Sequence, residues 1–257
     1  MAAKALAIVA GAGPGTGASI ARAFAAKGYA VALLARTPTT LQNLETELTT
    51  KYGSGAARAF PTDISNSQAV SSTFASIKAI YPDSPWRVAV YNVNTRWVVK
   101  PFLELEESEY MGVIQSHVGG AFAFAKGVLR EMEASAALEG EQGDKIKKGT
   151  LIFTGATAAT RGSARFAALA SASFALKAMS QSLAREFQPK GIHVAHAIID
   201  GMIDTERVQG MVGGSGSAKT GERIDPGEIA KAYIYLTEQA PSGWTHELDL
   251  RPSNEKW

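Results

Sequence analysis

The chain has 257 residues, a formal net charge of +2 and 19% charged residues, so it lacks both the strongly basic surface that nucleic acid requires and an acidic tail. It contains no cysteine, which excludes disulfide bonds, thiolate metal sites and a cysteine nucleophile. At this length we expect one layered α/β domain over residues 1–257.

The first predicted strand, around Ala7–Ala10, leads through a glycine-dense turn into an Ala-rich amphipathic helix. Gly11, Gly15 and Gly17 lie in this turn, and Thr16 lies between the last two. Glycine tolerates positive φ and lets the backbone approach a pyrophosphate, while the N–H groups of the helix's first turn attract the anion. The turn therefore predicts a dinucleotide site, although similar turns also occur without a ligand.

The residues after the second predicted strand indicate which dinucleotide is bound. The first helix ends at Lys27-Gly28, and Tyr29–Ala35 completes a βαβ unit. An NAD-specific site has an acid at the end of this strand, on the ribose 2′-OH, whereas this chain has Arg36 and Thr37. Because an arginine suits a 2′-phosphate, we predict NADP(H).

Strand-like and helical segments alternate along the rest of the chain. The predicted strands are Ala57–Phe60, Arg87–Tyr91, Thr150–Thr154, Ile192–Ile198 and a final Leu248–Pro252; the predicted helices are Leu41–Tyr52, Ser65–Ile80, Ser108–Ala136 and Phe166–Phe187. This alternation predicts an α/β fold, a Rossmann-like doubly wound three-layer sandwich with a parallel sheet. Two loops interrupt it: Gly140–Gly149, which is polar and charged, and Gly210–Gly221, a flexible Gly/Ser-rich run that we predict to be a substrate lid.

The chain enters its first strand directly, without a cleavable leader, and no stretch of about 20 apolar residues follows. We therefore expect a cytoplasmic protein that acts on a small-molecule substrate, with no membrane and no nucleic-acid partner.

With these elements in order, the chain resembles the short-chain dehydrogenase/reductase family over nearly its whole length. Ala10–Gly17 is similar to the family's Thr-Gly-x-x-x-Gly-x-Gly turn with alanine in place of the threonine, and Asp200–Thr205 is similar to its Pro-Gly motif. The resemblance implies adenine contacts from Asp63 and Ile64, and a nicotinamide contact from Thr205. The cofactor residues that we expect are Gly11, Gly15, Thr16, Gly17, Arg36, Thr37, Asp63, Ile64, Asn92, Val93 and Thr205.

The family's catalytic residues are Asn, Ser, Tyr and Lys, with Tyr as the proton donor. Aligning Leu183–Glu186 and Arg161-Gly162 with the family puts His117, Ala156, Leu169 and Ser173 at the four positions. A competing register uses Lys177 as the lysine, but it needs four extra residues after Gly162 and puts Ser173 in the tyrosine position. Neither register yields a Tyr-x-x-x-Lys pair, because no tyrosine occurs between Tyr110 and Tyr233.

Leucine and alanine cannot donate a proton, so ordinary ketone reduction by the family mechanism is predicted to be disabled. A hydride added to a ketone makes an alkoxide that needs a proton, whereas a hydride added to an iminium ion gives a neutral amine directly. We therefore predict a reductase of an imine, an iminium ion or an activated double bond, acting in specialised metabolism and coupled in some cases to cyclisation. The alternatives are a non-redox cyclase or isomerase, and a protein that keeps NADP(H) as a structural ligand.

Four residues are candidates for the catalytic half of the site. Asp200, where the family has proline, could accept a cationic substrate or be an acid that binds backbone N–H groups in a turn. His117 could relay protons or simply be packed in an apolar helix. Arg165, with Arg161 nearby, could bind an anionic substrate or be a solvated surface residue. Trp97 lies beyond the carboxyl end of a strand, where it could line an aromatic pocket.

Two further expectations concern metals and assembly. His193 and His196 are an odd number of residues apart on one strand and so face opposite sides, and we predict no metal site. The resemblance also implies a homo-dimer or homo-tetramer formed through Ser108–Ala136 and Phe166–Phe187. Finally, Thr154–Ala158, Ile199–Gly201 and the missing catalytic residues resemble degenerate fungal members that couple imine reduction to a Diels–Alder cyclisation in indole alkaloid assembly.

Overall fold

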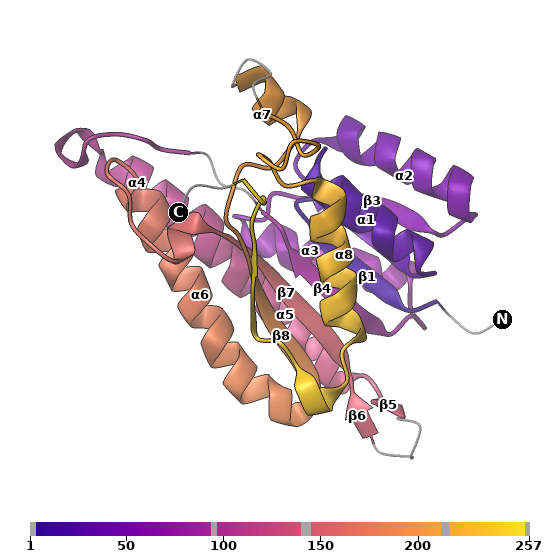
Figure 1. Cartoon of the computed structure of the whole chain (residues 1–257). Coiled ribbons are helices and arrows are strands. Elements are labelled where there is room, and N and C mark those ends of the chain that lie inside the picture. Colours follow the sequence, from indigo (N-terminus) through magenta and orange to yellow (C-terminus); the bar gives the residue numbers. More distant parts are fainter. Residues whose placement is uncertain (1–3, 94–96, 140–144, 212–215, 255–257) are drawn as a thin grey trace.

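The computed structural model describes residues 4–93, 97–139, 145–211 and 216–254. Within these residues the main sheet has seven parallel strands in the order β3-β2-β1-β4-β7-β8-β9 (Figure 1). The strands are β1 (Leu6–Ala10), β2 (Ala30–Ala35), β3 (Ala57–Pro61), β4 (Trp86–Tyr91), β7 (Gly149–Ala156), β8 (Ile192–Ile199) and β9 (Glu247–Leu250). The predicted doubly wound parallel α/β fold is therefore confirmed.

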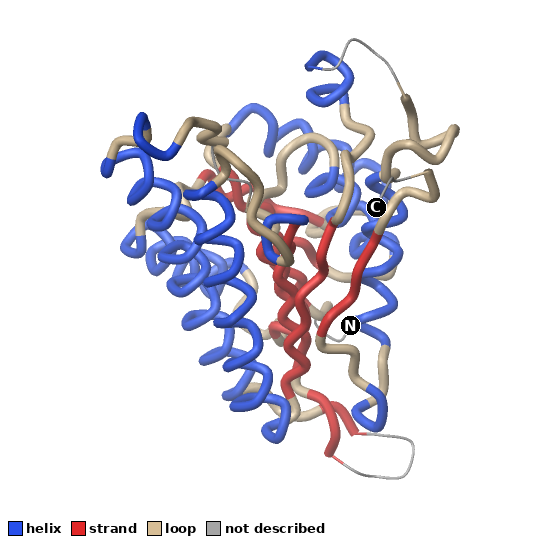
Figure 2. Tube along the Cα trace, turned by 60° about the vertical axis from the view of Figure 1, so that its left-hand side comes forward, coloured by secondary structure: helices blue, strands red, loops and turns tan. Residues whose placement is uncertain are grey.

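Helices cover both faces of this sheet (Figure 2). One face carries α3 (Ser67–Ile80), α5 (Gly120–Ala134) and α6 (Ala167–Phe187); the other carries α1 (Thr16–Ala26), α2 (Pro38–Tyr52) and α8 (Pro226–Glu238). The shorter α4 (Glu107–Ile114) packs on α6, and α7 (Glu206–Met211) stands beyond the carboxyl ends of the strands.

Because side chains alternate along a strand, a strand contributes to two hydrophobic cores, one on each face of the sheet. In β1, Leu6 and Ile8 pack with the helices of the α6 face, while Ala7 and Val9 pack with those of the α8 face. All five residues of β1 are buried, as expected for a strand in the middle of a parallel sheet. The same alternation makes His193 and His196 of β8 face opposite sides, as predicted.

The predicted long helix Ser108–Ala136 is wrong in detail. Glu107–Ala134 is interrupted by a π-helical segment, Gln115–Gly119, between α4 and α5. Here the Tyr91 hydroxyl donates a hydrogen bond to the Ser116 carbonyl, 3.0 Å away. Amphipathic spacing does not reveal such a local widening, which recurs at functional sites.

Two helices begin at other residues than predicted, because capping residues determine where a helix starts. α2 begins at Pro38, three residues before the predicted Leu41, because proline is pre-organised for the first turn of a helix. α3 begins at Ser67 because the Asn66 side chain accepts hydrogen bonds from the amides of Gln68 and Ala69.

The two predicted loops have different outcomes. Within Gly140–Gly149, β6 (Lys145–Lys147) pairs with β5 (Leu138–Glu139), so this part is a hairpin rather than a loop. The predicted lid Gly210–Gly221 is only partly described, since residues 212–215 lie outside the described residues. The second half of this loop is hydrogen-bonded to the chain near the C-terminus, because the Asn254 backbone amide donates to the Gly221 carbonyl, 2.8 Å away.

The strand order reverses between β1 and β4. The chain winds from β1 outward to β3, then returns to the other side of β1 as β4. In open parallel sheets, ligands bind beyond the carboxyl ends of the strands at such a reversal. The glycine turn after β1 and Asn92 after β4 both lie here. Among the described helices, none has the length and apolar character to cross a bilayer.

Candidate functional site

The turn after β1 requires glycine at positions 11 and 17 for steric reasons. Gly11 has φ +83°, and a Cβ built there would lie 2.1 Å from the backbone oxygen of Asn92. A Cβ on Gly17 would lie 2.0 Å from the Gly11 oxygen. No real Cβ tolerates such distances, so the turn can close only with glycine at these two positions. This close packing aims the amino end of α1 over the end of the sheet.

The amino end of α1 suits an anion. Its cap residue is Gly15 at φ +91°, which has no side chain to occupy the first-turn N–H groups, and no acidic residue lies in that turn. Such an end combines free N–H donors with the positive end of the helix dipole. Thr205 also belongs to this region, because a Cβ on Gly15 would lie 2.7 Å from its methyl group. Thr16, at the first position of α1, is buried.

Asn92 joins the turn to β4. Its side-chain amide donates to the Gly11 carbonyl at 3.3 Å, and its backbone amide donates to the Ala10 carbonyl at 2.9 Å. The next residue, Val93, packs against the core on the α6 face. The segment predicted to lie beneath the cofactor is thus tied directly to the glycine turn.

Residues after β2 and β3 line the outer side of the same edge. Arg36 and Thr37 are exposed where β2 ends, and Asp63 is exposed after β3. Hydrogen bonds from the Ser65 hydroxyl and amide lower the pKa of Asp63, and the nearby positive charge of Arg36 lowers it further. Ile64 is buried beside it. The structure therefore gathers the predicted cofactor residues from β1, β2, β3, β4 and the segment after β8 along one edge of the sheet.

The residues that the alignment puts at the family's catalytic positions lie further along this edge. Ala156 ends β7, and Leu169 and Ser173 are one turn apart on α6. Leu169 is half-buried and Ser173 is buried. The alternative lysine, Lys177, forms an ion pair with Glu247 of β9, 2.9 Å between Nζ and Oε1. Neither register of the alignment brings a tyrosine–lysine pair to this position.

His117 lies in the π-helical segment and is buried, with no hydrogen-bond partner for Nδ1 among the described residues. Burial lowers the pKa of His117 to about 4, because desolvation disfavours the imidazolium form. It is therefore neutral near pH 7 and cannot serve there as a cationic acid. Its proton-relay role stays a prediction.

Asp200 is not the free carboxylate that a cationic substrate would need. Its side chain is 1% exposed and paired with Arg251, and it accepts a hydrogen bond from the Thr157 hydroxyl. The Arg161 guanidinium approaches the same carboxylate, with 3.7 Å between Nη1 and Oδ2. Asp200 therefore contacts three side chains, those of Thr157, Arg161 and Arg251, instead of the substrate cation or the backbone N–H groups that the sequence suggests.

Sequence reasoning missed Arg251, although a signal for it exists. β9 pairs in parallel with β8, and Ile199 is opposite Leu250. The residues that follow each strand, Asp200 and Arg251, must then be neighbours. The final strand was predicted, but its position at the edge beside β8 was not.

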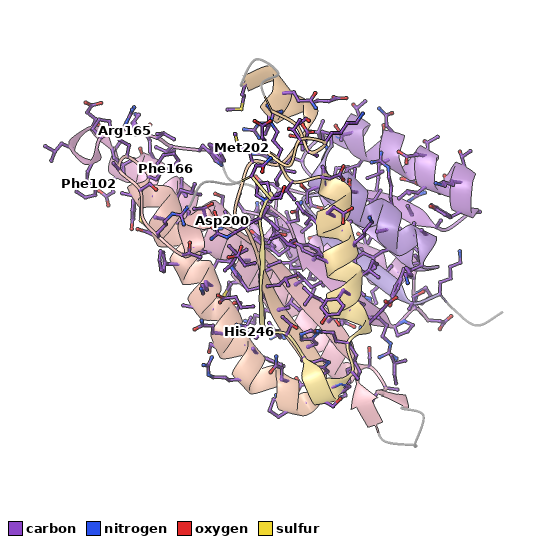
Figure 3. All side chains as sticks on the ribbon, in the orientation of Figure 1. Phe102, Arg165, Phe166, Asp200, Met202 and His246 are labelled. Atoms are coloured by element: carbon purple, nitrogen blue, oxygen red, sulfur yellow. The ribbon has the colours of Figure 1, made fainter. Side chains whose placement is uncertain are left out.

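The remaining candidates are spread apart. Figure 3 shows Phe102, Arg165 and Phe166 together near the amino end of α6, away from Asp200, and Met202 near α7. Arg165 is exposed at φ +71°, and its carbonyl accepts a hydrogen bond from the Lys100 amide. Trp97 is 52% exposed. The structure thus does not bring Arg165 and Asp200 into one cluster, and no group of three potential metal ligands occurs among the described residues.

The chain is similar to several known proteins. The family model for the short chain dehydrogenase matches residues 5–213. A solved short-chain dehydrogenase from Rhodopseudomonas palustris is 33% identical, with a TM-score of 0.77, covering 96% of this chain and 98% of that one. The very-long-chain 3-oxoacyl-CoA reductase of Debaryomyces hansenii is 29% identical over 73% of this chain. The matched part spans about half of that relative, 53% of its length.

A third similar protein is an NADPH-bound short-chain oxidoreductase from Pseudomonas aeruginosa that contains an atypical catalytic centre. It is 18% identical, with a TM-score of 0.83, covering 98% of this chain and 97% of that one. At this identity the likeness shows the fold alone.

Proposed function

Because the chain belongs to the short-chain dehydrogenase family, we propose that it is an NADP(H)-dependent oxidoreductase that reduces an imine, an iminium ion or an activated double bond. The proposal is supported by the glycine turn, which is closed by steric contacts at Gly11 and Gly17, and by the alignment, which puts Ala156 and Leu169, residues that cannot donate a proton, at the family's Ser and Tyr positions. Hydride transfer is retained and protonation of an alkoxide is lost.

NADP(H) is favoured over NAD(H) by the charge at the end of β2. Arg36 is exposed there, with no acid beside it in sequence to bind a ribose 2′-OH. The pyrophosphate would lie on the amino end of α1, and Asn92 and Thr205 flank the path toward the nicotinamide. Similar solved structures hold NADP or NADPH.

The chemistry that we propose balances without a tyrosine. Bound NADPH supplies a hydride. An iminium ion, or an imine that binds in its protonated form, would take this hydride at carbon, the π electron pair would move to nitrogen, and the products would be a neutral amine and NADP⁺. An activated double bond would leave a carbanion, which would take its proton from solvent. Leu169 and Ala156 exclude water from the reacting carbon, which protects an iminium ion from hydrolysis.

The biological setting that we propose is specialised, alkaloid-like metabolism, with cyclisation following reduction in the same pocket. A second candidate is a cyclase or isomerase that keeps NADP(H) as part of the pocket wall. It is favoured by the same apolar pair, Leu169 and Ala156, which could shape a substrate without reacting with it.

The test is a titration of the purified protein with NADPH and NADH, followed by cofactor fluorescence, and then addition of ketones, cyclic imines and iminium salts. We expect NADPH to bind and to be oxidised by imines or iminium salts but not by ketones. Binding without oxidation would favour the cyclase candidate, and no binding would overturn both.

Two sets of variants sharpen this test. Arg36→Ala should weaken NADPH binding about tenfold or more and leave NADH binding nearly unchanged, because only NADPH carries the 2′-phosphate. Arg58→Ala, which removes an exposed arginine from β3, is the control. The triple variant Ala156→Ser, Leu169→Tyr, Ser173→Lys should gain ketone reduction if the missing groups account for its loss.

A further inference from the structure

Four side chains meet where three neighbouring strands end. Thr157 follows β7, Asp200 follows β8 and Arg251 follows β9, while Arg161 comes from the loop after Thr157–Ala159. We call these residues the Asp200 cluster. Because Thr157 directly follows Ala156, the cluster adjoins the position at which we propose that hydride is transferred.

The two arginines of the Asp200 cluster differ in their exposure and in how closely they approach a carboxylate. Arg251 is 16% exposed and lies between two carboxylates, since it pairs with Asp200 and its Nε is 3.3 Å from Asp249 Oδ2. Arg161 is 53% exposed, and its nearest carboxylate oxygen, on Asp200, is 3.7 Å away, beyond hydrogen-bond distance. The negative charge of Asp200 is therefore balanced mainly by the Arg251 guanidinium and stabilised by the hydrogen bond from Thr157.

Arg161 consequently keeps donors available. A guanidinium has five N–H groups in a planar fork that matches a carboxylate. Among the described residues, Asp200 is the only partner of the Arg161 guanidinium, and the contact uses a single nitrogen at long range. Asp200 holds the guanidinium in position without occupying the fork.

The cofactor's phosphates are too distant to take this fork. They would bind at the turn after β1, whereas Asp200 follows β8, and β4 and β7 lie between these strands. Three strand spacings of about 4.8 Å separate β1 from β8 by roughly 14 Å. An anion bound by this guanidinium would therefore belong to the substrate rather than to the cofactor.

We propose that Arg161 binds a carboxylate of the substrate, so that the molecule reduced is an imine or iminium compound that also carries a carboxylate group. This inference rests on the proposed function for the reaction, but it makes a separate claim about binding. Asp200 and Thr157 act as positioning residues, and Arg251 links the C-terminal strand to the specificity of the site.

Binding is tested first, without catalysis. The NADPH-loaded protein is titrated with benzoate and with benzamide, which has a similar shape but no charge, and cofactor fluorescence is followed. Benzoate should bind at least about tenfold more tightly than benzamide, and Arg161→Gln should remove this preference. Arg185→Gln is the matched control, because it removes one exposed positive charge from α6, where the guanidinium donates to the Gln181 carbonyl and has no acidic partner among the described residues. It should leave both affinities unchanged.

Turnover is tested second, with 1-pyrroline-2-carboxylate and 1-pyrroline as a matched pair of imines. Arg161→Gln should lower kcat/KM for the carboxylate about tenfold, mostly through KM, and leave the neutral imine unchanged. Arg161→Lys should retain part of the preference, since it keeps the charge but loses the fork.

The two proposals can fail separately. If neither imine oxidises NADPH but benzoate binding depends on Arg161, the reductase proposal fails and the carboxylate site stands. If benzoate and benzamide bind equally, or Arg161→Gln changes neither, the carboxylate site is overturned whatever the imines do.

Discussion

Asp200 shows how strongly one buried side chain can depend on its partners. Replacing it with Asn removes the negative charge and leaves Arg251, which is largely buried, without its closest counter-ion. Breaking a buried ion pair from one side costs about 3–5 kcal/mol. We expect Asp200→Asn to lower the free energy of unfolding by about this amount, as measured by urea denaturation.

Asp249→Asn is the matched control, since Asp249 pairs with the same arginine but is 43% exposed. Solvent screens such a pair, and its loss should cost less than about 1 kcal/mol. Equal effects of the two substitutions would contradict a special role for the buried pair.

The buried histidines predict how stability depends on pH. Burial lowers the pKa of His117, His193 and His196 to about 4 in each case, against 6.5 for an ordinary histidine. The unfolded chain therefore binds more protons between these values. The stabilisation is complete above pH 6.5 and is lost as the pH falls toward 4.

Urea denaturation between pH 7 and pH 5 measures this effect. Between pH 4 and pH 6.5, each histidine adds up to about 1.4 kcal/mol per pH unit to the slope of the free energy of unfolding against pH. His196→Gln removes one of the three titrations, so the slope should decrease by about a third. We chose His196 because no hydrogen bond to its ring nitrogens occurs among the described residues, so little else is lost. An unchanged slope would count against burial as the cause.

At the scale of elements, the turn after β1 requires glycine for two reasons: its positive φ, and the close approach of the Asn92 backbone to Gly11. Gly11 and Gly28 have nearly equal φ values, +83° and +87°. A Cβ on Gly11 would meet the backbone of Asn92, whereas a Cβ on Gly28 would have no heavy atom within 4 Å. Gly28→Ala should therefore cost only the conformational penalty, about 1–2 kcal/mol.

Gly11→Ala should cost clearly more and should also abolish NADPH binding, because the turn must open to relieve the clash. Urea denaturation and cofactor fluorescence measure the two effects. If both variants lose the same stability and both bind NADPH, the turn tolerates a side chain and the steric argument fails.

Most of the elements were predictable because their signals are local. Apolar runs alternating with amphipathic segments indicated the parallel sheet, and the turn around Gly11 indicated the nucleotide edge. The π-helical segment at Gln115–Gly119 and the hairpin of β5 with β6 were not predicted, since neither leaves a distinct periodicity. The Asp200–Arg251 pair was missed because its partners are 51 positions apart and meet only through the pairing of β8 with β9.

At the scale of the whole molecule, the α6 side of the sheet exposes apolar side chains. Phe122 of α5 is 57% exposed, and Phe174 of α6 is 45% exposed. Both helices cover the same face of the sheet. Large exposed apolar groups are typical of surfaces that bind another protein, and a two-fold dimer would bury the same residues of both subunits at once.

We therefore predict that the chain assembles as a homo-oligomer through α5 and α6, and that Phe122→Glu combined with Phe174→Glu makes it monomeric. Light scattering after size-exclusion chromatography measures the mass. The control is Tyr235→Glu on α8, which removes an aromatic residue of equal exposure, 57%, from the opposite side of the sheet and should leave the mass unchanged. A wild-type chain that elutes as a monomer would contradict the prediction, and a double variant that keeps its mass would assign the interface to another surface.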